Sequence, residues 1–462
     1  MTQNNSQGFF YKLLFLDRAE FLKLIIGGIL FFSIIGAYTL TQELKYGIFS
    51  AIVTPYHIPT AKLLAFVILF PAIILDGYLV DRFQRYQLVI LYTFIFGVIG
   101  VFFTFFLSHP EIGINNTKQD VGRIFGWAFF LYVEAFAPFL LGVFWAFMNS
   151  IHNPKNAQKT YGFIVATSKV GGIVVTSFAY LFLSQQKLLS ISLDGTKRIQ
   201  IILLLASSLL LFASFFLSIM IKKLNLSAFK GYHTKINEKT KKTGVWIGIQ
   251  LLLKNRYVLG IFLLVFLADI LAEILNYKRI LISVKSSQAA NNELSYMLAK
   301  LYLQMFYMQF LGFAISLIFT NSLMRFLGTR FCMFIMPIFT LIFALTYILT
   351  GIDTIIIWLY IVIKAMYYTI GAPVRESLYI VTNKDIQFKA KFVIDALGIK
   401  LARNTGQAFN YMTNMLSKFQ GQFASMLATN ILFITIPIVW VVVAYFVGNT
   451  YNGAIKKDKV IA

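Results

Sequence analysis

Residues 58–80 read IPTAKLLAFVILFPAIILDGYLV, an apolar run with Lys62 near its start. About 20 apolar residues are enough for a helix to cross a bilayer. A charge near the centre of such a helix costs about 2.5–3.5 kcal/mol on insertion scales. Four other apolar runs carry a charge in the same way, at Glu134, Lys169, Glu273 and Lys364. Because the chain repeats this cost, we expect these charges to line a polar path through a membrane.

The composition is that of an integral membrane protein. Hydrophobic residues make up 58% of the chain and charged residues 13%, whereas a soluble domain has about 45–50% and 25%. The single cysteine excludes an internal disulfide and argues against a thiolate metal site. No H-E-x-x-H, nucleophile elbow or phosphate-binding loop motif is present. We therefore expect no catalytic residues, no metal and no cofactor.

Hydropathy predicts an all-α membrane protein with about twelve spans in two six-helix bundles. The basic stretch 223–248 divides the spans six and six. We expect an N-terminal bundle over 1–222, a cytoplasmic linker over 223–248 and a C-terminal bundle over 249–462. The predicted spans are 21–42, 58–80, 87–108, 122–149, 160–184, 199–221, 257–277, 298–320, 326–350, 354–373, 389–415 and 425–448, of which 389–415 is the most polar.

The distribution of cations predicts the orientation. More than half of the 41 Lys and Arg residues fall on the side that holds both termini and the linker, so both termini are expected in the cytoplasm. The net charge of +23 follows from this bias and from contact with anionic lipid headgroups, and nucleic-acid binding is not expected. Residues 1–21 have no short apolar region with a small-residue cleavage site and are not rich in Ser and Arg, so we expect neither a cleaved signal peptide nor a transit peptide. We expect a multi-pass protein of a bacterial inner membrane.

The turn at 77–88 reads GYLVDRFQRYQL and resembles the G-x-L-A-D-R-x-G-R-K-x-x-L signature of the major facilitator superfamily. Asp81 suits a helix N-terminus or an arginine partner, and Arg82 and Arg85 stay on the cytoplasmic side. A generic charged turn is the alternative. The segment 325–330, RFLGTR, is similar to a decayed copy, as expected for two repeated halves. The gating motif implied by the resemblance is Gly77, Asp81, Arg82 and Arg85.

A closer resemblance covers most of the chain. Residues 376–395, ESLYIVTNKDIQFKAKFVID, are similar to the K-E-M-A-Y-I-P-L-D…K-x-K-G-K-A-A-I-D stretch of the ATP/ADP translocases, the nucleotide transporters of intracellular bacteria and plastids. Matches elsewhere run in the same order through both halves. The residues that match at charged or aromatic positions are Lys45, Lys62, Glu134, Phe144, Trp145, Phe147, Tyr161, Glu273, Lys364, Tyr368, Glu376, Tyr379, Lys389, Lys391, Asp395 and Arg403.

The charges of this family are rearranged in the chain. Residues 41–46, TQELKY, lack the arginine and aspartate of the family's L-R-x-L-K-D. Lys169 adds a cation where the family has G-A-N, Tyr367 replaces a family lysine, and Ala372 replaces an aspartate. The resemblance therefore implies the fold and nucleotide transport, but the exact substrate does not transfer.

A nucleotide di- or triphosphate carries several negative charges, which must be balanced on a low-dielectric path. Lysine supplies compact charges and arginine a bidentate fork. Candidate substrate-binding cations are Lys45, Lys62, Lys169, Lys364, Lys391, Lys400 and Arg403. Lys400, Arg403, Gln407, Asn410 and Asn414 recur at helical spacing and predict one polar stripe facing a cavity. A tilted helix at the cytoplasmic rim is the alternative.

Each candidate also has a simpler interpretation. Lys45 and Lys62 could snorkel to an interface. Glu134 and Glu273 could pair with the lysines in the empty state and release them to phosphate, bind a proton for coupling, or serve as structural partners. We expect Asp76, Asp269 and Asp395 to hold helix ends or pair with Lys391. Tyr161, Tyr368 and Phe147 are candidates for stacking on the base, with core or lipid-facing packing as the alternative.

Together these features predict a secondary transporter that works by alternating access. The expected cargo is a nucleotide, with ATP/ADP exchange as the leading mode. A proton-coupled nucleotide or other organic-anion symporter is an alternative. From another class, a lipid-linked transferase or flippase would need an Asp/Glu/His cluster at one membrane face and long loops, and the sequence has neither. The expected partners are the nucleotide and membrane lipids, and the chain is expected to act as a monomer. The sequence leaves the base preference and the coupling ion open.

Overall fold

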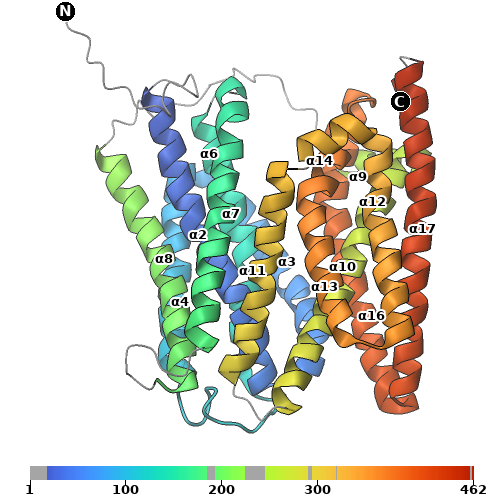
Figure 1. Cartoon of the computed structure of the whole chain (residues 1–462). Helices are drawn as coiled ribbons and strands as arrows, with labels where there is room; N and C mark the ends of the chain where they lie inside the picture. Colours follow the sequence, from blue (N-terminus) through green and yellow to red (C-terminus); the bar gives the residue numbers. More distant parts are fainter. Residues whose placement is uncertain are drawn as a thin grey trace, which may run out of the picture. The chain divides into compact units, whose positions relative to one another are not determined.

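The computed structural model describes residues 18–152, 154–184, 193–223, 245–289, 294–318, 320–457 and 460–461. Within these ranges nearly every residue is helical, and the only β-structure is an isolated bridge between Thr382 and Ile461. Figure 1 shows long helices lying side by side within each part of the chain. Only helices and closed barrels satisfy every backbone polar group inside a bilayer. The predicted all-α class is confirmed.

The helices follow the predicted windows. In the first half they are α2 (Arg18–Ile52), η1 (Pro55–His57), α3 (Ile58–Arg82), α4 (Arg85–Leu107), α5 (Ile124–Glu134), η2 (Ala137–Leu141), α6 (Gly142–Ile151), α7 (Pro154–Ser184) and α8 (Gly195–Lys223). In the second half they are α9 (Val245–Lys254), α10 (Arg256–Ala289), α11 (Leu294–Ile318), α12 (Thr320–Thr350), α13 (Asp353–Met366), η4 (Tyr367–Gly371), α14 (Ala372–Tyr379), η5 (Ile386–Ala390), α15 (Lys391–Val393), η6 (Ile394–Gly398), α16 (Ile399–Gln420) and α17 (Gln422–Lys456).

Among the described residues, ten helices are long and apolar enough to cross a membrane. The other two predicted windows are also helical. The window at 58–80 lies in α3, and the described apolar helix there, Pro55–Leu69, is shorter. The window at 389–415 is a continuous helical run that ends in the polar helix α16. The structure adds α9, a ten-residue helix that hydropathy did not predict.

Two of these ten helices, one from each half of the chain, contain a π-helical segment, and two further π segments, η5 and η6, precede α16. The π segment η2 begins at Ala137, three residues after Glu134 at the end of α5, and η4 follows α13 and begins at Tyr367. Proline stands at the second residue of η2 (Pro138) and just after η4 (Pro373). Proline removes a backbone donor and clashes with the preceding turn, and one-turn π-bulges often occur at functional sites.

The chain divides into two compact units, which are described separately. The first comprises residues 1–54, 65–237 and 289–306, and the second 55–64, 238–288 and 307–462. The second unit thus includes the first residues of α3, and the first unit includes the first half of α11. The predicted boundary at 223–248 stays a prediction.

Close helix packing supports the first unit. Lipid tails are as apolar as leucine, so membrane helices associate through close packing and interhelical hydrogen bonds. A Cβ at Gly97 of α4 would lie 2.7 Å from Cγ of Leu211 on α8. On α11, the Tyr302 hydroxyl donates to the Leu40 carbonyl of α2 at 2.6 Å. Small residues and backbone acceptors therefore set the helix spacing here.

Candidate functional site

The second unit holds Lys62 in a buried ion pair. Pro59, near the start of α3, suits a first helical turn, and Lys62 follows at the next turn. Its Nζ lies 2.7 Å from Oε2 of Glu273 on α10. The two side chains are only 12% and 13% exposed, so the charges neutralise each other away from water.

Helix α16 completes the surroundings of Glu273. Gln407 Nε2 donates to the same carboxylate oxygen at 2.7 Å, so that oxygen accepts from one cation and one neutral donor. Gly406 allows this approach, because a Cβ there would lie 3.0 Å from both the Glu273 Cβ and the Ile270 carbonyl oxygen. The glycine therefore sets the distance between α16 and α10.

One turn earlier on α10, Asp269 forms a second ion pair. Arg403 Nε donates to Asp269 Oδ1 at 3.1 Å, and the Tyr367 hydroxyl donates to Oδ2 at 2.7 Å. The Asp269 side chain is 2% exposed and that of Arg403 is 45% exposed. Asp269 was expected to hold a helix end or pair with Lys391, which is wrong, because it lies inside α10 and anchors Arg403. The Arg403 side chain is therefore the more exposed member of this ion pair.

Lys364 of α13 adds a third cation to this group. Its Nζ lies 5.8 Å from the centre of the Tyr367 ring, and both Lys364 and Arg403 attract the Glu273 carboxylate. We call Lys62, Asp269, Glu273, Lys364 and Arg403 the charge cluster. Three cations and two carboxylates give it a formal charge of +1.

Residues of the predicted polar stripe on α16 have different surroundings along the helix. Arg403 and Gln407 face α10, as described, and Asn410 Nδ2 is 3.5 Å from the Glu273 carbonyl oxygen. Asn414 Nδ2 donates to the Tyr277 hydroxyl at 2.6 Å and to the Tyr56 carbonyl at 3.0 Å. Lys400 is exposed. Its described contact is through its carbonyl, which accepts from Asn404.

The first unit holds a different ion pair. Lys45 Nζ lies 2.6 Å from Oε1 of Glu134, and their side chains are 1% and 27% exposed. The ammonium group also donates to Gln42 Oε1 at 2.8 Å and lies 4.5 Å and 5.1 Å from the rings of Tyr46 and Phe130. Because Lys45 is enclosed, it does not snorkel to the surface of this unit.

The two tyrosine candidates and Lys169 lie in different surroundings. The Tyr161 hydroxyl donates to Asn149 Oδ1 at 2.7 Å, and its ring packs edge-on against Trp145. Lys169 is half-buried in α7. The Tyr368 ring is 49% exposed and packs edge-on against Tyr367 in the second unit. Tyr368 is therefore the more accessible of the two rings.

Lys391 belongs to a surface network in the second unit. Its ammonium donates to Glu376, while Asp395 lies 3.7 Å from Arg375 Nη1. Asp395 lies in the first turn of η6, as one of its two predicted roles required, and its ion pair is with Arg375 of α14, while Lys391 interacts with it at longer range. Lys389 pairs with Asp385 at 2.7 Å. These ion pairs tie α14 to the helical run that follows it.

The gating motif is described only in part. Arg82 ends α3 and Arg85 begins α4. Gly77 and Asp81 lie within α3. The surroundings of Gly77 and the side chains of Asp81 and Arg325 are outside the described part of the structure.

The sequence analysis missed a buried cluster in the first unit. Lys23 Nζ donates to Glu20 Oε1 and to the Ile151 carbonyl, both at 2.7 Å, and His152 Nε2 is 3.9 Å from Glu20 Oε2. Burial lowers the pKa of His152, which favours the neutral imidazole. A lone histidine at a span end gave no sequence signal for this cluster.

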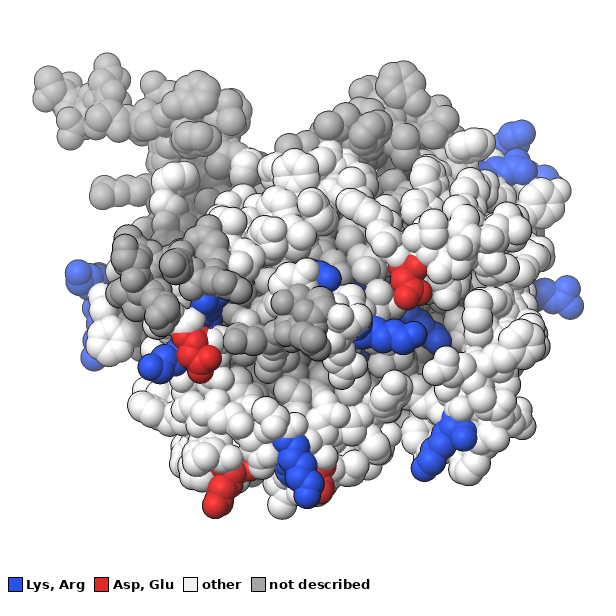
Figure 2. Space-filling view, turned by 60° about the horizontal axis from the view of Figure 1, so that its bottom comes forward, with Lys and Arg blue, Asp and Glu red and all other residues white. Residues whose placement is uncertain are grey.

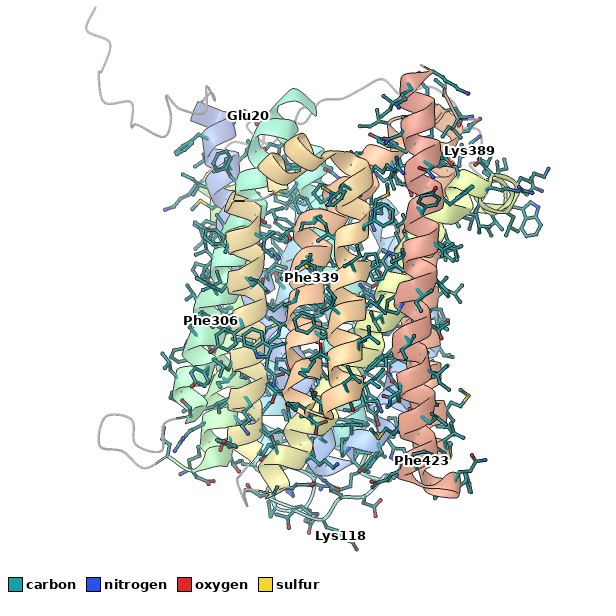
Figure 3. The ribbon with its side chains drawn as sticks, turned by 45° about the vertical axis from the view of Figure 1, so that its right-hand side comes forward. Glu20, Lys118, Phe306, Phe339, Lys389 and Phe423 are labelled. Atoms are coloured by element: carbon teal, nitrogen blue, oxygen red, sulfur yellow. The ribbon has the colours of Figure 1, made fainter. Side chains whose placement is uncertain are left out.

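On the face in Figure 2 most of the surface is uncharged, and several of the Lys and Arg side chains lie beside Asp or Glu side chains. In Figure 3, Glu20 and Lys118 mark opposite ends of the first unit, and Lys389 and Phe423 opposite ends of the second. Within the described ranges, no group of three or more His, Cys, Asp or Glu side chains could hold a metal ion. The cations themselves are the groups available to bind a ligand.

No family profile and no curated protein matches the chain. Its structure is similar to that of the nucleoside transporter NupG, with a TM-score of 0.55, 14% identity and coverage of 93% of this chain and 98% of that chain. It is also similar to the POT family transporter PepTSo, with a TM-score of 0.55, 13% identity and coverage of 96% of this chain and 98% of that chain. For a bacterial homologue of the human lysosomal transporter Spinster, the TM-score is 0.53 and the identity 12%, with coverage of 96% of this chain and 98% of that chain. At these identities the likeness shows the fold alone, which is all-α and major-facilitator-like.

Proposed function

We propose that the protein is a secondary transporter that moves nucleotides across the membrane by alternating access, with ATP/ADP exchange as its leading mode. The observation that carries this proposal is the charge cluster, in which a lysine, an arginine and two carboxylates form ion pairs that join α10 to α3 and to the polar helix α16. Such groups are costly in a membrane and mark substrate or ion pathways. The structural similarity to a nucleoside transporter, NupG, is compatible with this substrate class.

In the empty state, Glu273 neutralises Lys62 and Asp269 neutralises Arg403. A phosphate group offers several anionic oxygens and can compete with Glu273 for Lys62. When Glu273 releases Lys62, Gln407 still donates a hydrogen bond to its Oε2. This remaining bond lowers the cost of the exchange. Substrate binding therefore replaces one ion pair by another and does not leave a lysine unpaired.

Arg403 plays a complementary part. Because it keeps a bond to Asp269 while 45% of its side chain is exposed, it can bind an anion without giving up its own partner. Guanidinium groups favour bidentate contacts with phosphate oxygens. Lys62 thus acts as the exchangeable cation and Arg403 as the fixed one, and the exposed Tyr368 ring is a candidate platform for the base.

A proton-coupled symporter of nucleotides or other organic anions is the second candidate. The observation that favours it is Glu134, which is 27% exposed while its partner Lys45 is enclosed. A half-buried carboxylate beside a fixed cation can bind and release a proton during the cycle.

The test is uptake of labelled ATP, ADP, GTP and CTP by bacterial cells producing the protein, followed by a chase with unlabelled nucleotide. Exchange predicts rapid loss of label during the chase and little effect of a protonophore. Symport predicts retention of label and collapse of uptake with the protonophore. Absence of uptake of all four nucleotides by folded protein in the membrane would overturn the nucleotide assignment.

A further inference from the structure

Helix α9 has an exposed apolar side that no described element covers. Trp246 and Leu253 are each 67% exposed, and Ile247 is 40% exposed. With ten residues, α9 is about 15 Å long, which is half the thickness of a bilayer core. A helix of this length cannot span the membrane, and such apolar side chains beside a membrane span suit the lipid interface.

Packing fixes α9 against one end of the second unit. A Cβ at Gly248 would lie 2.6 Å from the Lys389 carbonyl oxygen and from Cγ2 of Val393. Figure 3 shows Lys389 at the end of this unit opposite to Phe423. Only a glycine allows α9 to lie so close to that backbone, so the helix is held at the level where α10 begins.

A groove follows directly after α9, with about 760 Å³ of empty space. Lys254 and Arg256 line it from the junction of α9 and α10, and Phe446 and Thr450 line it from α17. Both cations and Phe446 are exposed, and none of the described residues that line the groove is acidic. The groove therefore offers two positive charges beside an apolar wall.

We propose that α9 and this groove form a binding site for an anionic phospholipid. Lys254 and Arg256 bind the headgroup phosphate, Phe446 packs against an acyl chain, and Trp246 and Leu253 enter the interface. Basic pockets beside membrane helices recognise anionic headgroups in this way, and the indole ring favours the headgroup level. The site is independent of the transported substrate, and it holds α9 at the membrane surface.

The test uses the purified full-length protein in detergent containing equal amounts of phosphatidylglycerol and phosphatidylcholine with the same acyl chains. Native mass spectrometry measures the ratio of the two lipids that remain bound. The expected result is a preference for phosphatidylglycerol that falls about fivefold for each removed cation, in Lys254→Ala, Arg256→Ala and the double variant. Lys418→Ala is the matched control, because Lys418 is an exposed lysine near the opposite end of the same unit.

A second pair of changes separates headgroup from acyl-chain binding. Trp246→Ser with Leu253→Ser is expected to lower retention of both lipids and leave their ratio unchanged. Thermal unfolding of every variant verifies that it is folded. An unchanged lipid ratio in the folded double alanine variant would overturn the proposal. So would a dimer mass that disappears in the serine variant, because a second copy would then cover α9.

Discussion

The ion pairs of the two units differ in which partner is enclosed. In the first unit the lysine is buried and the carboxylate is open, with Lys45 at 1% and Glu134 at 27% exposure. In the second unit Lys62 and Glu273 are nearly equally exposed, at 12% and 13%. Enclosed Lys45 is not accessible to a substrate anion and is suited to a structural role. Lys62 shares Glu273 with Gln407, so a substrate anion can replace Glu273 as its partner. The presence of a charged residue in an apolar helix therefore does not by itself show that the residue binds substrate.

The surroundings strengthen this contrast. Lys45 is held by Gln42 and by two aromatic rings in addition to Glu134, so its charge is satisfied on several sides. Around Glu273 the additional groups act on the carboxylate, through Gln407 and the nearby Lys364. The described contacts of the first unit stabilise its cation, and those of the second unit stabilise its anion.

The largest expected effect is on stability in the first unit. Glu134→Ala leaves Lys45 without its anion, and removal of one partner of a buried pair costs about 3–5 kcal/mol. Because Glu134 is 27% exposed, we expect about 3 kcal/mol. Glu273→Ala should cost less, since Lys62 lies in the second turn of α3 and can turn toward the helix end. Thermal unfolding in detergent measures both.

A double variant sharpens this result. Lys45→Met with Glu134→Leu removes both charges and should recover most of the stability lost in Glu134→Ala, because apolar pairs often replace buried ion pairs without loss. If the double variant is as unstable as the single one, Lys45 does not depend on Glu134 for its burial, and the contrast between the units fails.

The second effect is on transport in the second unit. Lys62→Ala removes one charge-assisted contact to phosphate, worth about 1.5–3 kcal/mol, so nucleotide uptake should fall about ten- to a hundredfold. Membrane insertion should not suffer, because a charge is removed from an apolar helix. Initial uptake, normalised to folded protein, measures the effect, and Lys62→Arg tests whether charge alone suffices. Uptake at the wild-type level in the alanine variant would assign Lys62 a structural role.

The fold could be predicted from the sequence because the membrane leaves few alternatives. Apolar windows predicted helices at all twelve positions, since a spanning chain must satisfy its backbone internally. Helix α9 escaped prediction because it is short and depends on contact of Gly248 with the Lys389 backbone. Similarly, Arg279 is almost fully buried against the Tyr360 ring at 4.6 Å, although it falls just beyond a predicted window.

The sequence could predict which residues belong to the site, but not how they pair. The cost of charge in an apolar run identified Lys62, Glu273 and Lys364, but it could not reveal their partners. Asp269 and Arg403 are 134 residues apart, and a pairing over this separation depends on how α10 packs against α16. The sequence also gave Glu134 and Glu273 the same set of roles, because their different exposure arises only in the folded units.

The third effect tests the fixed cation. Asp269→Asn keeps the shape of the side chain but removes the charge that orients Arg403. We expect the KM for nucleotide to rise about tenfold while kcat changes little, since half-exposed Arg403 loses only part of a charge-assisted bond. Tyr367→Phe, which leaves the ion pair intact, should raise KM less. A fall in kcat without a change in KM would show that Asp269 acts in the conformational step and does not position Arg403 for binding.

The smallest effect concerns Gln407, the neutral donor to Glu273. In Gln407→Leu the Glu273 carboxylate keeps only Lys62 at that oxygen, so it should compete more strongly with phosphate for the lysine. A hydrogen bond to a charged group contributes about 1.5 kcal/mol at the low end, and part of it is recovered by the tighter ion pair, so the KM should rise about two- to fivefold. Gln200→Leu is the matched control, because Gln200 is a glutamine of the first unit that donates to the Thr104 carbonyl and to Ser108. An equal rise in both variants would mean that leucine disturbs packing in general, and Glu273 would then hold Lys62 no more loosely than Glu134 holds Lys45.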